Sequence, residues 1–179
     1  MKNNSDEIIL LAIDPSLAST GYACINRQGI LQVGRIKSKE KNKIKRLVAL
    51  QKEMKQLLSI LKPTHVIYEG YSKRIINPNT SLGLAEGGGV FKAEMYKQGV
   101  KELLIVPPKT LKLWVTGSGN ADKPKMAQAA LTRWEFKAKC NDEVDAYCLL
   151  QFGRAAYRLV RSRSRDLFKK CELITVNEI

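Results

Sequence analysis

Apolar residues follow one another without interruption in residues 8–13, and the run ends in an acid, Asp14. A continuous apolar stretch of this length predicts a strand that is buried on both faces of a sheet. Residues 20–26 and 30–37 favour two further strands, with a turn at Arg27, Gln28 and Gly29 between them. The beginning of the chain therefore predicts a three-stranded meander.

Residues 41–62 repeat apolar positions at helical spacing, and Pro63 ends the predicted helix. The other face of this helix is rich in lysine, which is typical of a helix that packs on a core and meets solvent on its far side. A short strand is expected over residues 65–69, and it also ends in an acid, Glu69.

Helical and extended patterns alternate through the remaining residues. They predict a helix over 80–98, a strand over 103–106, helical segments near 109–115 and 124–136, and a last helix over 142–161. This order of elements predicts an α/β fold, a five-stranded mixed sheet flanked by helices. Residues 1–160 are expected to form one domain. Residues 161–179 are expected to form a basic C-terminal tail, which either binds a partner or is a solvated end.

The balance of charge indicates the kind of partner. There are 31 Lys and Arg residues against 17 Asp and Glu residues, so the formal net charge is +14. A surplus this large is typical of a protein that binds nucleic acid. No apolar run approaches the roughly 20 residues of a membrane span, so no membrane contact is expected.

The cysteines and the histidine exclude one class of DNA-binding protein. The chain has one histidine, and its four cysteines show no CxxC spacing. A zinc finger is therefore not expected. Free thiols are typical of a reducing compartment, so we expect a cytoplasmic protein.

Four carboxylates are placed where they could carry chemistry. Asp14 and Glu69 each end a strand, while Asp142 and Asp145 lie three residues apart at the start of the last predicted helix. If the two strands are parallel neighbours, their carboxyl ends meet at one edge of the sheet. Converging carboxylates repel one another unless a cation lies between them, and Mg²⁺ or Mn²⁺ fits oxygen ligands. Two such ions can promote hydrolysis of a phosphodiester.

Each acid also has a structural interpretation. Asp14 precedes a proline and could be a turn residue. Asp142, Glu143 and Asp145 could simply complement the dipole of the last helix. The joint pattern, rather than any single acid, favours a catalytic site.

Five segments of the chain form a recognisable pattern when they are taken in order. IDPSLASTGY, from Ile13 to Tyr22, and VIYE, which ends at Glu69, resemble the first and second motifs of the RuvC family of Holliday-junction resolvases. The segments VPPK and VTGSGNADK, which end at Lys109 and Lys123, resemble the region that leads to the last helices. DEVDA, from Asp142 to Ala146, resembles the closing motif. The match covers residues 8–155 in order, although Ser16 replaces a glycine that is usual in the first motif.

The resemblance implies a ribonuclease-H-like fold, a homodimer and paired symmetric nicks in four-way DNA junctions. It implies that two Mg²⁺ ions, with Mn²⁺ as a substitute, are held by Asp14, Glu69, Asp142 and Asp145. Lys123 matches a lysine that contacts the reacting phosphate. A divergent bacterial or phage-encoded member, at work in the cytoplasm of the cell or of the infected host, would fit the departures from the motifs.

The remaining candidates would bind DNA. Lys112 matches a second basic position of the family. Tyr71 lies near the place of an aromatic residue that wedges against junction bases, although Gly70-Tyr71-Ser72 departs from the usual pattern. Lys73, Arg74 and Lys109 are placed to contact phosphates, or are ordinary solvated residues.

Three alternatives to junction resolution remain open at this point. One is a broader nuclease that cuts other branched DNA, and another is a junction-binding protein that does not cleave. The third is an actin-like phosphotransferase, for which the chain is too short to supply the two domains that clasp a nucleotide.

Overall fold

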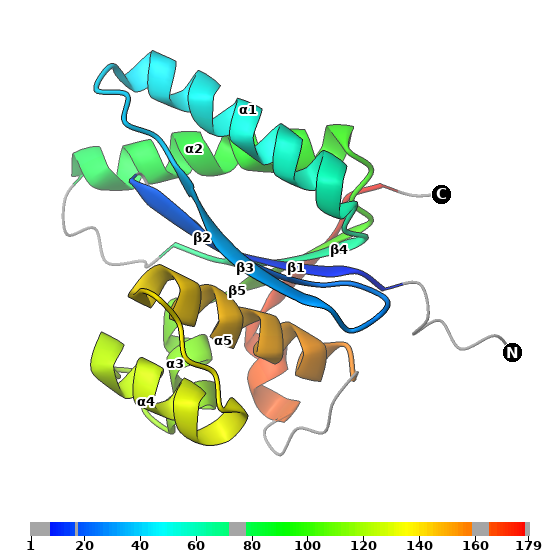
Figure 1. The fold of residues 1–179 in the computed structure, drawn as a ribbon, viewed down its shortest axis with the longest axis vertical. Helices are drawn as coiled ribbons and strands as arrows, with labels where there is room; N and C mark the ends of the chain where they lie inside the picture. Colours follow the sequence, from blue (N-terminus) through cyan, green and yellow to red (C-terminus); the bar gives the residue numbers. More distant parts are fainter. Residues whose placement is uncertain (1–7, 17, 72–77, 159–164, 178–179) are drawn as a thin grey trace, which may run out of the picture.

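The computed structural model describes residues 8–16, 18–71, 78–158 and 165–177. It has one mixed sheet between two layers of helices (Figure 1). The strands are β1 (Leu10–Asp14), β2 (Ser19–Ile25), β3 (Leu31–Lys37), β4 (His65–Glu69), β5 (Glu102–Val106) and β6 (Glu172–Thr175). The helices are α1 (Lys43–Leu61), α2 (Pro78–Lys97), α3 (Pro108–Thr116), α4 (Lys123–Trp134) and α5 (Asn141–Ala156), and a 3₁₀ helix, η2, spans Arg165–Lys170. These elements confirm the predicted fold class.

The order of strands in the sheet is β3-β2-β1-β4-β5-β6. β1 pairs with β2 antiparallel and with β4 parallel, and β4 pairs with β5 parallel. The ends of β1, β4 and β5 therefore lie at one edge of the sheet. The antiparallel course of β2 brings its beginning, and the end of β3, to the same edge.

β1 is buried on both faces, as its apolar run predicts. Leu10 and Ala12 point into the core beneath α3, α4 and α5, whereas Leu11 and Ile13 point into the core beneath α1 and α2. None of these four residues is exposed to solvent. The alternation places one strand between two separate cores, so β1 anchors both layers of helices.

The sheet has six strands rather than the expected five. The additional strand, β6, lies within residues 161–179, the segment expected to be a basic tail, and it pairs antiparallel with β5. Its register places Leu173 opposite Leu104 and Ile174 opposite Leu103. Four residues give too short an alternation to predict a strand beside a run of basic residues.

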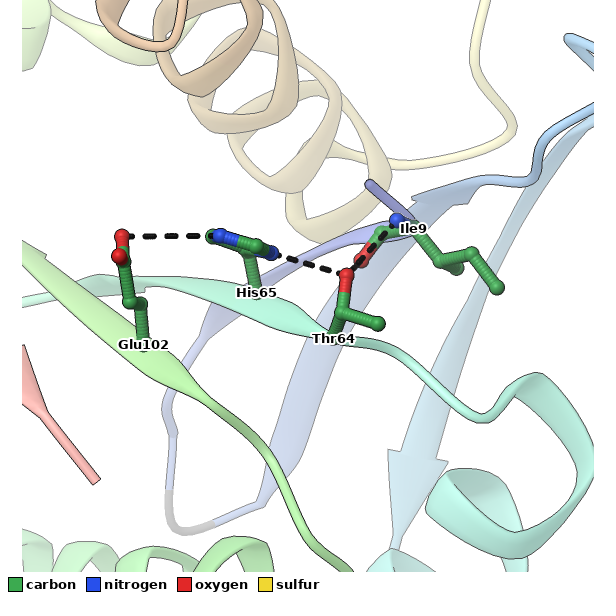
Figure 2. A network of polar contacts seen from close by, with 4 residues as sticks. All are labelled: Ile9, Thr64, His65 and Glu102. Atoms are coloured by element: carbon green, nitrogen blue, oxygen red, sulfur yellow. Dashed lines mark hydrogen bonds and ion pairs between the residues drawn. The ribbon is translucent and has the colours of Figure 1, made fainter. Parts of the chain in front are cut away.

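A polar network fixes the opposite edge of the sheet, where β4 and β5 begin (Figure 2). The backbone N–H of Ile9 donates to the hydroxyl of Thr64 at 2.9 Å, and the same hydroxyl lies 2.8 Å from Nδ1 of His65. Nε2 of His65 lies 3.6 Å from a carboxylate oxygen of Glu102. These contacts join the beginnings of three neighbouring strands.

In the described part of the chain, no helix is both long enough and apolar enough to cross a membrane.

Candidate active site

The ends of β1 and β4 bring two of the predicted acids together. Ile13 pairs with Tyr68 in the parallel ladder, so Asp14 and Glu69 occupy the next row, at the carboxyl ends of adjacent strands. The carboxyl group of Glu69 donates a hydrogen bond to that of Asp14. This bond requires a proton on Glu69 when no cation is present.

Helix α5 brings the other two acids to the same place. Gly21 pairs with Asp14 across the antiparallel ladder, and a Cβ at Gly21 would collide with the backbone carbonyl of Asp142. Near the other end of the helix, a Cβ at Gly153 would collide with the side chain of Ile67. Two glycines thus let α5 lie directly on the sheet, and this close approach carries Asp142 and Asp145 to the end of β1.

A buried threonine, Thr20, binds the backbone of Ser16, which closely follows Asp14. The hydroxyl of Thr20 donates to the carbonyl of Ser16 at 3.0 Å and accepts from its N–H at 3.2 Å. Thr20 is completely buried, so this pair of bonds is shielded from water. The backbone of Ser16, two residues after the first acid, is therefore held by Thr20, and the role of this hydroxyl group was not predicted from the sequence.

Two lysines complete the charge of the site. Lys112 lies on α3, and its charge acts on Glu69 and Asp145. Lys123 is the first residue of α4, where Asp122 caps the helix by accepting from the N–H of Lys125 at 3.0 Å. The charge of Lys123 acts on Asp14 and Asp145. The structure thus brings four acids and two of the predicted lysines to one edge of the sheet.

The electrostatics of the site favour protons on the acids when no cation is bound. Burial raises the pKa of Asp14, an effect that the hydrogen bond from Glu69 opposes. Burial and the nearby charge of Asp14 raise the pKa of Glu69 well above its usual value. Burial, followed by the charge of Asp14, raises the pKa of Asp145 to about 6. A group of carboxyls with this tendency is suited to exchange its protons for a divalent cation.

The donor set consists of oxygen atoms, which is the chemistry that hard divalent cations require. Within the described ranges, no three His, Cys, Asp or Glu side chains already form a close metal-binding group. The acids are instead linked through the hydrogen bond and the mutual repulsion described above. Asp14, Glu69, Asp142 and Asp145 are therefore suited to a hard cation by their chemistry and their proximity.

Glu143, the third acid at the start of α5, has a structural role. It is buried, accepts a hydrogen bond from the N–H of Lys139 at 2.9 Å and lies 3.8 Å from Nε of Arg35. Its carboxylate thus closes the first turn of α5 and ties it to β3. This arrangement fits the helix-start interpretation for Glu143.

The predicted DNA-binding residues have different surroundings. Lys109 is exposed at the start of α3, and Lys112 is half-buried one turn later. Lys73 and Arg74 lie outside the described residues. Tyr71 is 40% exposed, and its hydroxyl donates to the carbonyl of Leu84 in α2 at 2.9 Å. Its ring therefore joins the end of β4 to α2, and the predicted contact with junction bases stays a prediction.

A comparison with protein families decides the relationship. The family model described as crossover junction endodeoxyribonuclease RuvC matches residues 10–149. The chain belongs to the RuvC family. The matched residues run from β1 into α5 and include all four acids together with Lys112 and Lys123, and they end before β6.

Individual relatives agree with this assignment. The crossover junction endodeoxyribonuclease RuvC of Prochlorococcus marinus (strain MIT 9211) is 27% identical over 161 residues, which cover 86% of this chain and 100% of that protein. The RuvC structure from Thermus thermophilus superposes with a TM-score of 0.67 at 17% identity, over 85% of this chain and 96% of that one. The structure of T. thermophilus RuvC in complex with a Holliday junction substrate superposes with a TM-score of 0.69 at 14% identity, over 87% of this chain and 98% of that one. These RuvC structures confirm the expected fold.

Proposed function

We propose that this RuvC-family chain is an endonuclease that resolves four-way DNA junctions by paired, symmetric nicks in a reaction that depends on divalent metal ions. The observation that carries the proposal is the meeting of Asp14, Glu69, Asp142 and Asp145 at one edge of the sheet. Lys112 and Lys123 lie beside them. The T. thermophilus relative in complex with a Holliday junction supports the same class of substrate.

The four acids would hold two Mg²⁺ ions, or Mn²⁺ in their place. Bound there, such ions would supply an activated water and would stabilise the charge that develops on the leaving oxygen. Asp14 and Glu69 lie at the ends of central strands, so the rigid sheet fixes their positions. Asp142 and Asp145 are fixed by the close approach of α5.

The lysines act on the substrate rather than on the acids alone. Lys123 is exposed at the start of α4, beside Asp14 and Asp145, and so its ammonium group can contact the phosphate that is cut. Lys112 is partly buried, its charge acts on Glu69 and Asp145, and so it offsets part of the negative charge of the carboxylates. Both effects favour approach of a negatively charged backbone to an acidic centre.

A homodimer would place two such sites on one junction. One face of α2 is exposed and consists of apolar or small residues at helical spacing: Leu82, Ala85, Gly89, Ala93 and Tyr96. A Cβ at Gly89 would meet no atom within 4 Å in this chain, so the glycine is not required by packing within one protomer. Small residues let a second helix approach closely, which supports a second copy of this chain as the partner. Light scattering should give twice the chain mass, and Ala93→Glu should give the monomer.

The decisive experiment is cleavage of a labelled synthetic four-way junction in Mg²⁺, beside a linear duplex and a three-way fork. Symmetric nicks on opposing strands of the junction are expected, and none in the duplex. Asp14→Asn should abolish cleavage and keep binding, because it removes a metal ligand while the phosphate-binding lysines remain. Full activity of Asp14→Asn would contradict the assignment of the site.

Two other outcomes point to the alternatives. Equal cutting of forks and junctions would indicate a broader branched-DNA nuclease. Binding without cleavage in either Mg²⁺ or Mn²⁺ would indicate a junction-binding protein. Calorimetry separates these cases, because a tight Mn²⁺ site that Glu69→Gln removes is expected only of the nuclease.

A further inference from the structure

The connection from β3 to α1 carries the densest positive charge among the described residues. Residues 37–46, which we call the basic arm, have the sequence KSKEKNKIKR, with six basic residues and one acid. Six positive charges less one negative charge give the arm a net charge of +5, out of +14 for the whole chain. More than a third of the net charge therefore lies in ten residues.

The basic arm begins at the same edge of the sheet as the four acids. Lys37 pairs with Ser19 on β2, whereas Asp14 pairs with Gly21 two residues further along that strand. Two strand spacings across the sheet and two residues along it separate Lys37 from Asp14 by about 12 Å. Figure 1 shows β3 rising from this edge into the first turn of α1. The arm is thus a neighbour of the site on the side of α1.

Hydrogen bonds within the arm hold its backbone in a defined shape. Arg46 turns inward, and its Nε donates to the carbonyl of Glu40 at 2.9 Å. Asn42 caps α1 by accepting from the N–H of Lys45 at 3.1 Å. The hydroxyl of Ser38 accepts from the N–H of Glu40 at 3.3 Å. One arginine and two polar caps thus order the segment, while the side chains of the lysines take no part in these bonds.

The five lysines of the arm are all exposed. They are Lys37, Lys39, Lys41, Lys43 and Lys45. Within the part of the chain that the structure describes, basic and acidic side chains pair at Arg35 and Glu143, at His65 and Glu102, and at Lys169 and Asp166, and none of these pairs uses a lysine of the arm. The arm therefore presents its charge to solvent.

Folding does not account for these lysines. Lys43 and Lys45 occupy the first turn of α1, which contains no acid. Cations at that end oppose the helix dipole and so disfavour the helix. Alternate lysines at close spacing also repel one another. A polyanion bound across the arm would reverse both effects.

We propose that the basic arm binds the phosphate backbone of a duplex DNA arm that leaves the cleavage site. The inference rests on the proposed function, because it takes the junction as substrate. From Lys37 to Lys43 the chain spans at most about 20 Å, which places the arm within about 30 Å of Asp14. At about 3.4 Å per base pair, the contacted phosphates lie roughly four to nine base pairs from the cut.

The test replaces three lysines of the arm by the triple substitution Lys39→Gln, Lys41→Gln and Lys43→Gln. The matched control is Lys52→Gln, Lys55→Gln and Lys97→Gln, which removes the same charge from exposed positions further from the site. Junction binding is measured by fluorescence anisotropy in EDTA across a series of salt concentrations. Single-turnover cleavage in Mg²⁺ is measured separately at saturating enzyme. Thermal unfolding verifies that both variants are folded.

The arm variant should bind the junction about 10–100-fold more weakly at 0.1 M salt, and its salt slope should fall by roughly 2–3, since each duplex phosphate contact contributes about 0.9. The control should change little. Once saturated, the arm variant should cut at the rate of the unsubstituted protein. Neutral methylphosphonates in place of the phosphates four to nine base pairs from the cut should weaken junction binding by the unsubstituted protein. They should leave junction binding by the arm variant unchanged.

Two results would overturn the proposal. One is an unchanged salt slope in the arm variant, and the other is an equal loss in the control, which would mean that net charge alone is responsible. Failure of the proposed function is separate from these results, because it would remove cleavage from the unsubstituted protein while the difference in binding between the two variants persisted.

Discussion

Replacing Asp145 by Asn should stabilise the protein while it removes activity. Asp145 is partly buried, and burial together with the charge of Asp14 raises its pKa to about 6, from 3.8 for an unperturbed aspartate. The folded state therefore holds this proton more tightly than the unfolded state does. Below the unfolded pKa the carboxyl is protonated in both states and costs nothing. As the pH rises through about 6 the group ionises in the fold, and stability is lost.

The size of the effect follows from the same pKa. Each pKa unit corresponds to about 1.4 kcal/mol, so ionised Asp145 costs the folded state up to about 3 kcal/mol. Asp14 supplies part of this repulsion, and the energy is shared between the two residues rather than added. Asp145→Asn should therefore raise the free energy of unfolding at pH 7.5 by about 1–3 kcal/mol, or raise Tm by about 2–10 °C for a chain of this size.

Urea denaturation in EDTA at pH 7.5 and pH 4 measures the effect. Trp114 and Trp134, stacked 5.8 Å apart and packed on the core, provide the fluorescence signal. The gain should be present at pH 7.5 and small at pH 4. Asp166→Asn, at an exposed aspartate paired with Lys169, is the control and should change little. No gain at pH 7.5, or an equal gain at both pH values, would refute the assigned electrostatics.

Three further predictions concern single contacts. Gly21→Ala should lower the free energy of unfolding by about 1–3 kcal/mol and abolish cleavage, because the new methyl group displaces Asp142. Gly87→Ala is the control: a Cβ there meets no atom within 4 Å, so the same unfolding and cleavage assays should show little change. Tyr71→Phe should lower the free energy of unfolding by about 1 kcal/mol, because the hydrogen bond to Leu84 is lost, and it should keep cleavage. If cleavage is lost only in Tyr71→Ala, the result would support a contact between the ring and the junction. Burial lowers the pKa of His65, so its contribution to stability is complete above about pH 6.5 and is lost as the pH falls through the folded pKa. In urea titrations, the free energy of unfolding should therefore decrease less between pH 7.5 and pH 5.5 for His65→Gln than for the unsubstituted protein. The opposite pH trend of Asp145 is present in both proteins and cancels in this comparison.

The strands and helices of the core could be predicted because their apolar patterns are strong. The run that ends at Asp14 is a buried central strand, and the helical spacing of residues 41–62 buries Leu50, Met54 and Leu58. The last helix ends at Ala156, earlier than predicted. The prediction extended too far because the apolar spacing continues past Arg158, whereas the backbone of Arg158 is left-handed, at a φ of 60°. A local change of backbone at a non-glycine residue leaves no pattern in the sequence.

The acids of the site could be named from the sequence, but the means of their convergence could not. Strand ends and motif spacing indicated Asp14 and Glu69. The close packing that brings α5 to them depends on Gly21 and Gly153, which meet residues distant in the chain. A glycine required for a tertiary contact looks the same in a sequence as a glycine in a turn. For the same reason the basic arm was interpreted as part of a solvated helix face, since its position beside the site depends on strand pairing.

The sixth strand, β6, protects the sheet against aggregation, so a chain shortened before it should lose that protection. Without β6, the apolar strand β5 would become the edge of the sheet, with unpaired N–H and C=O groups available to another chain. During synthesis β5 leaves the ribosome well before the residues of β6 that will cover it. The nascent protein therefore passes through a stage in which β5 is an unpaired edge strand that can pair with another chain. A version truncated after residue 160 should therefore retain the four acids and yet aggregate.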